Sequence, residues 1–148
     1  MNIDTSFMRR RREKQIKFER SMLRELSLQK LKKGVQNHFG SFSSGAGHML
    51  DNAIEEGCYD VAVEAFLLGS RYSRLGYYGS SLETVMERSK NERVNLAKAL
   101  KEFITYWTQM GPIPVHDESL QVKCEHYVDD WWKEGYTKGV QKYKLRLH

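Results

Sequence analysis

The chain has 148 residues, of which 40% are hydrophobic and 29% charged, and its formal net charge is +5. This length predicts a single domain that can bury a core without disulfides or a structural metal. No segment is apolar enough to span a bilayer, and no apolar stretch follows the basic N-terminus as a secretory signal requires. The two cysteines, Cys58 and Cys124, lie far apart in the chain and form no metal-binding motif. We therefore expect reduced thiols in a cytoplasmic protein, and no cofactor.

The positive charge is concentrated at the N-terminus. Residues 1–40 contain eleven Arg or Lys and four acidic residues, a net +7, which leaves −2 for the remainder of the chain. Such asymmetry favours an anionic partner. A basic helix that packs on the acidic body of its own domain would have the same composition.

The first predicted element is one long basic helix over residues 7–37. Residues 1–12 have little to bury, so we expect them to form a flexible basic arm. Residues 38–47, HFGSFSSGAG, are dense in Gly and Ser and predict a loop. The long helix is indicated by apolar residues at spacings of about three to five, namely Phe18, Met22, Leu26, Leu31 and Val35.

A second helix is predicted over residues 46–72, continuous through Gly57 and ended by Gly76 and Gly79. Ser80 and Glu83 form a capping box that opens a third helix. Its apolar stripe runs to Met110, with a polar break in the middle.

GPIP, at residues 111–114, ends this helix. Asp117 is expected to cap the last helix, and Gly135 and Gly139 to weaken its end. No alternating strand pattern is present. The chain therefore predicts an all-α fold, a four- to five-helix bundle in a single domain over residues 1–148.

The run RRRREK is the clearest functional signal. Consecutive arginines at the start of an amphipathic helix are suited to bind phosphates of nucleic acid or the headgroups of an anionic membrane. No DNA- or RNA-recognition motif accompanies them, and aromatic residues are not interleaved with them in the sequence. A solvated helix start is the alternative. The candidate anion-binding residues are Arg9, Arg10, Arg11, Arg12 and Lys14.

Two carboxylates, Asp60 and Glu64, lie four residues apart in the most apolar part of the chain. Metal sites of helical carboxylate proteins need Glu-x-x-His pairs, and the chain has none. We therefore predict a polar stripe whose carboxylates pair with Arg71, Arg74 or the basic first helix. An enzyme that uses Asp60, Glu64 and His126 is a less favoured reading.

The cysteines are expected to be buried structural thiols, because each lies on an apolar helical face. No sequence motif of a nucleophile, phosphate loop or dinucleotide site is present. The chain is therefore expected not to be an enzyme.

Two adjacent tryptophans, Trp131 and Trp132, cannot both face one core, because successive helical residues point about 100° apart. Trp131 shares a face with Leu120, Cys124 and Tyr127, which predicts a core position. Trp132 would then pack on a second element, such as the N-terminal helix, or form part of a partner surface.

Three segments, EEGCYDVAVEAFLLGSRYSRLGYYGSS (55–81), DDWWKEGY (129–136) and KYKLRLH (142–148), resemble the YbaK family of Bacillus-type bacteria. This family is a domain of unknown function, distinct from the tRNA-editing deacylase that shares its name. The resemblance implies a small cytoplasmic protein and supplies no catalytic residues.

These features favour a non-enzymatic module that binds an unidentified protein partner or has a regulatory role. The alternative is association with nucleic acid or an anionic membrane through the basic N-terminal helix.

Overall fold

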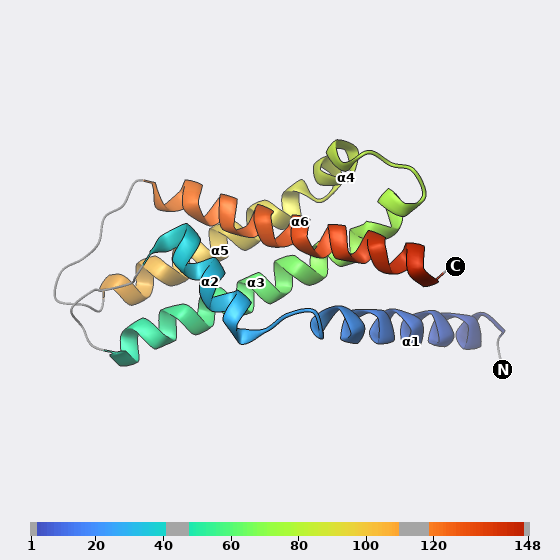
Figure 1. The fold of residues 1–148 in the computed structure, drawn as a ribbon, viewed down its shortest axis with the longest axis horizontal. Helices are drawn as coiled ribbons and strands as arrows, with labels where there is room; N and C mark the ends of the chain where they lie inside the picture. Colours follow the sequence, from blue (N-terminus) through green and yellow to red (C-terminus); the bar gives the residue numbers. More distant parts are fainter. Residues whose placement is uncertain (1–2, 41–47, 110–118, 147–148) are drawn as a thin grey trace.

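The computed structural model describes residues 3–40, 48–109 and 119–146, which form six helices and no strand. The all-α class is confirmed, but the predicted number of four or five helices is too low. The predicted stops at 111–114 and Asp117 lie outside the described residues. The helices are α1 (Ile3–Leu23), α2 (Leu28–Phe39), α3 (His48–Tyr77), α4 (Leu82–Arg88), α5 (Lys90–Gln109) and α6 (Leu120–Arg146) (Figure 1).

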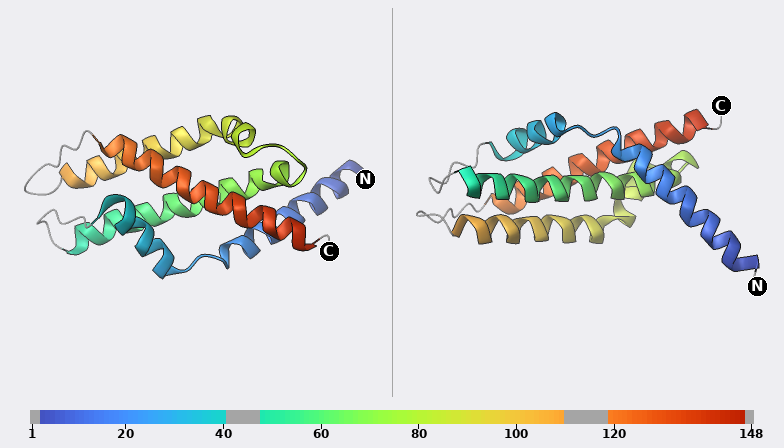
Figure 2. Two further views of the ribbon diagram at one scale, coloured as in Figure 1. Left: turned by 45° about the horizontal axis from the view of Figure 1, so that its top comes forward. Right: turned by 90° about the horizontal axis from the view of Figure 1, so that it is seen from below.

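The predicted long N-terminal helix is in fact two helices, α1 and α2. Ser27 ends the continuity: it has extended backbone and its side chain accepts a hydrogen bond from the Lys30 backbone N–H at 3.1 Å, which caps α2. The turn before it lets α2 lie across α3 and α6, while α1 projects from the other end of the body (Figure 2). The segment predicted as a flexible arm is helical from Ile3 onward, and its flexibility stays a prediction.

Helices α3 and α6 form the central pair of the fold. They approach closely because glycines face backbone: a Cβ on Gly69 would collide with the carbonyl of Trp132, and one on Gly135 with the carbonyl of Phe66. Gly139 likewise faces Ser73. Gly135 and Gly139 were expected to weaken the helix end, but α6 continues through both and they allow its contact with α3. Continuity of α3 through Gly57 is confirmed.

The predicted third helix is interrupted at Ser89, which separates α4 from α5. The residue that caps α4 is Ser81, one position after the predicted cap, and it accepts from the Thr84 N–H. Arg93 occupies the interruption. Its guanidinium donates to the Met86 carbonyl and pairs with Asp129 of α6, both at 2.7 Å. Arg93, at the polar break, thus connects α5 with α4 and α6.

Both tryptophans of α6 are buried, with exposed fractions of 8% for Trp131 and 0% for Trp132. Trp131 lies in the main core, as predicted. Trp132 packs in a second cluster with Leu68 and Val85, and stacks on Tyr136. The predicted packing of Trp132 on a second element is confirmed, but that element is not the N-terminal helix, because its neighbours Leu68 and Val85 belong to α3 and α4. The alternative, a partner surface at Trp132, is wrong, because the side chain is fully buried. Because α6 is covered by α3 on one side and by α4 and α5 on another, two adjacent residues are both enclosed.

Candidate functional site

A basic groove lies beside α1, where this helix extends past the body of the protein. Phe18 and Met22, near the end of α1, are buried in the core. The same face continues toward the N-terminus beyond the edge of the core, so its side chains form one wall of an open groove of about 1370 Å³. The other wall is formed by the end of α3 and by α6. The lining residues are Phe7, Met8, Arg10, Arg11, Arg12, Lys14, Gln15, Phe18, Glu19, Arg71, Arg74, Tyr78 and Tyr143.

The groove is strongly cationic. Among the described residues that line it, six are Arg or Lys and one, Glu19, is a carboxylate. Glu19 accepts a hydrogen bond from Arg71 Nε, which joins α1 to α3. This pair neutralises one guanidinium and leaves the remaining cations in excess. A solvent-filled concave surface with one sign of charge attracts anions more strongly than isolated surface charges do.

Four of the five predicted anion-binding residues line this groove: Arg10, Arg11, Arg12 and Lys14. Arg9 is not among the residues that line it. The structure adds Arg71 and Arg74 from α3 to the cluster. The run of arginines in the sequence is thus one part of a cationic cluster that two helices, α1 and α3, form together.

Aromatic rings lie among these cations in a connected series. Phe18 stacks on Tyr143 of α6 with ring centroids 4.9 Å apart, and Tyr143 stacks on Tyr77 of α3 at 5.8 Å. Tyr77 contacts Tyr78 edge to face, and the guanidinium of Arg74 lies over the Tyr78 ring. The series therefore begins in the core and ends at an exposed ring in the groove.

The sequence did not reveal this series, because its rings come from three helices far apart in the chain. The only signal was the segment RYSRLGYY, in which arginines and tyrosines alternate near the end of α3. Aromatic residues are not interleaved with the arginines in the sequence, but the fold brings aromatic rings of other segments beside them.

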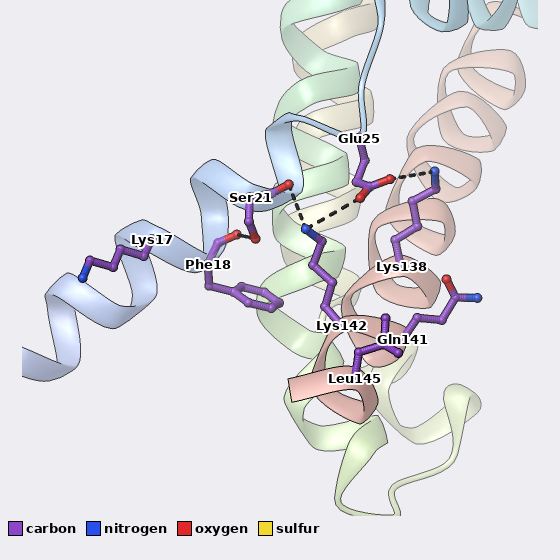
Figure 3. Close-up of a pocket in the computed structure, with 8 residues that line it drawn as sticks. All are labelled: Lys17, Phe18, Ser21, Glu25, Lys138, Gln141, Lys142 and Leu145. Carbon is purple, nitrogen blue, oxygen red and sulfur yellow. Dashed lines mark hydrogen bonds and ion pairs between the residues drawn. The ribbon is translucent and has the colours of Figure 1, made fainter. Parts of the chain in front are cut away.

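A second cavity, of about 500 Å³, lies between the end of α1 and α6 (Figure 3). Lys142 donates to the backbone carbonyl of Ser21 at 3.0 Å and lies 3.6 Å from Glu25, while Lys138 lies 3.7 Å from the same carboxylate. Lys17 extends away from this group in Figure 3. Glu25 thus contacts both lysines of α6, and the Ser21 carbonyl of α1 contacts one of them. These contacts hold the end of α1 against the body of the protein.

The carboxylates of α3 lie elsewhere. Asp60 and Glu64 are exposed, and within the described residues neither forms an ion pair. The predicted pairing with Arg71 is wrong, because Arg71 points toward Glu19 on α1. His126 is exposed on α6 and forms no cluster with these two carboxylates.

The described residues bring together no group of three or more His, Cys, Asp or Glu side chains that could hold a metal ion. Both cysteines are buried and unpaired. Burial raises the pKa of Cys58 and of Cys124 to about 12, so these thiols are protonated at neutral pH. Tyr127 donates a buried hydrogen bond of 2.9 Å to the Cys58 carbonyl, which fixes α6 against α3.

None of the helices, over the residues described, is both long and apolar enough to cross a bilayer. No solved structure matches the chain. The chain is 30% identical over 142 residues to the "Uncharacterized protein YbaK" of Bacillus subtilis (strain 168), which covers 96% of each protein. A family model described as "Protein of unknown function (DUF2521)" matches residues 1–148. The chain therefore belongs to the DUF2521 family, as its resemblance to YbaK indicated.

Proposed function

We propose that this protein is a non-enzymatic cytoplasmic module that binds a phosphate-rich macromolecule in the basic groove between α1 and α3. The observation that carries the proposal is the convergence of cations from two helices on one concave surface. Arg11 and Lys14 of α1 and Arg74 of α3 line the same groove, in which Glu19 is the one carboxylate among the described lining residues. Phosphates accept several charge-assisted hydrogen bonds, and arginine presents a fork of donors that matches them.

A protein partner, the function that the sequence favoured most, is supported less well. A typical protein interface has an apolar centre depleted of charge. The groove instead has guanidinium groups along its length, and Trp132, at which a partner surface was suggested, is buried.

Heparin, a sulfated polyanion, tests the proposal as a probe. Arg11→Glu/Arg74→Glu reverses two cations of the groove. The matched control is Lys98→Glu/Lys101→Glu, which makes the same change in net charge on exposed residues of α5. Among the described residues, α5 makes no contact with α1.

The groove variant should elute from a heparin column at much lower salt than the wild type, and the control close to the wild type. Thermal melting of all three proteins verifies that each is folded. Equal losses in both variants would show that heparin responds only to net charge, and the proposal would be wrong.

A further inference from the structure

We infer that the occupant of the basic groove is single-stranded nucleic acid, an inference that rests on the proposed phosphate-binding function. The groove contains two kinds of group at close quarters: guanidiniums, and aromatic rings exposed to solvent. Phe7 of α1 has an exposed fraction of 63% and Tyr78, at the end of α3, one of 69%. Both line the groove.

The aromatic series explains why Tyr78 is suited to receive a base. Its backbone N–H is bonded to the Arg74 carbonyl at 3.1 Å, and its ring contacts Tyr77, which is stacked on Tyr143. Phe18, at the start of the series, is buried in the core. A ring supported in this way loses little conformational freedom when a base stacks on it.

Single-stranded nucleic acid supplies both complementary groups. Its phosphates would contact Arg11, Lys14 and Arg74, while unpaired bases would stack on the exposed rings. Such binding is tolerant of sequence, because every base has a π face. In a duplex the base faces are already stacked on one another, so the rings of Phe7 and Tyr78 would contribute nothing.

An anionic membrane fits the groove less well. A helix that lies in a membrane surface needs a continuous apolar face opposite its charges. Phe7 and Met8, in the N-terminal half of α1, are each followed one turn later by an arginine on the same side: Phe7 by Arg11 and Met8 by Arg12. An arginine therefore interrupts the apolar row that begins at Phe7 and the one that begins at Met8, and neither row could form a continuous membrane-binding face.

The test compares four probes on the full chain: a labelled deoxythymidine strand of about 15 nucleotides, within the site size of one single-strand-binding fold, a duplex of equal length, heparin, and phosphatidylcholine vesicles containing phosphatidylserine. The variants are Tyr78→Ala, Tyr78→Phe and the control Tyr106→Ala. Tyr106 is an exposed tyrosine of α5, with an exposed fraction of 56%.

The wild type should bind the single strand more tightly than the duplex or the vesicles. Tyr78→Ala should weaken single-strand binding roughly 5- to 150-fold, the usual loss for one stacked base, and leave heparin binding unchanged. Tyr78→Phe keeps the ring and should bind like the wild type, as should Tyr106→Ala.

Tighter binding to the duplex or to the vesicles would overturn the inference and leave the proposed function intact. The same holds if Tyr78→Ala binds the single strand as well as the wild type does, since the groove would then act through charge alone. Failure of every polyanion to bind would remove the proposed function as well.

Discussion

Gly135 of α6 lies directly against the carbonyl oxygen of Phe66 of α3, with no space for a Cβ between the two helices. Gly135→Ala would normally stabilise a helix by up to about 1 kcal/mol. Here the added methyl group must push α6 away from α3, and overpacking of this kind costs about 1–3 kcal/mol or more. We therefore expect Gly135→Ala to lower the free energy of unfolding, measured by urea denaturation.

The matched control for this substitution is Thr137→Ala, on the exposed side of the same helix turn. It should leave the free energy of unfolding unchanged or slightly raised, because Ala has the higher helix propensity. A Gly135→Ala protein as stable as this control would show that α3 and α6 are farther apart than described.

The buried thiols predict a fall in stability at alkaline pH. Burial raises the pKa of Cys58 and Cys124 to about 12 in the folded protein, against 9.0 for an ordinary thiol, as in the unfolded chain. Above pH 9 the unfolded chain therefore loses these two protons while the folded protein keeps them. The free energy of unfolding should fall as pH rises from 9 toward 12, by up to about 1.4 kcal/mol per pH unit for each thiol.

Urea denaturation between pH 8 and pH 10 measures this fall. A Cys58→Ala/Cys124→Ala variant should show a shallower dependence, because it lacks the two thiols whose pKa is raised by burial. Identical slopes would mean that the thiols are not buried in the folded state.

Tryptophan fluorescence tests the burial of α6. Trp131 and Trp132 are buried, whereas Trp107 of α5 is half-buried. In a Trp107→Phe variant, iodide should quench almost no fluorescence until the protein is unfolded by urea. Quenching as strong as in the wild type would show that Trp131 or Trp132 is accessible to solvent, and would restore the suggestion of a partner surface.

Deletion of residues 1–12 separates binding from folding. The described side chains of this segment, from Thr5 to Arg12, include no buried residue, whereas Phe18 and Met22 stay in the core. The free energy of unfolding, measured by thermal melting, should therefore change by less than about 0.5 kcal/mol, as is usual for exposed positions. The affinity for heparin should fall. A large loss of stability would show that the arginines dock on the body of the protein.

The sequence was sufficient to predict the helical class, the continuity of α3 and the inner face of α6, because these follow from local periodicity. It did not reveal the division between α1 and α2, which depends on a single serine cap at Ser27 without Gly or Pro nearby. The sequence indicated that Trp132 packs on a second element but not that this element comes from α3 and α4, since that depends on how the helices surround α6.

The candidate site was predictable only in part. Its arginine run was visible in the sequence, whereas Arg74, Tyr78 and Tyr143 reach the groove through the packing of α3 and α6 beside α1. Tertiary contacts between segments more than 50 residues apart, such as Glu19 with Arg71, leave no periodic signal in the chain.

Titration of ¹⁵N-labelled protein with inorganic polyphosphate, followed by the chemical shifts of backbone and arginine side-chain N–H groups, locates the anion-binding surface. Shifts should be concentrated at Arg11, Lys14, Arg71 and Arg74, and at the backbone of Tyr78, with few changes on α5. Shifts centred instead on Lys138 and Lys142 in the second cavity, or spread evenly over the surface lysines, would show that the basic groove is not the binding site.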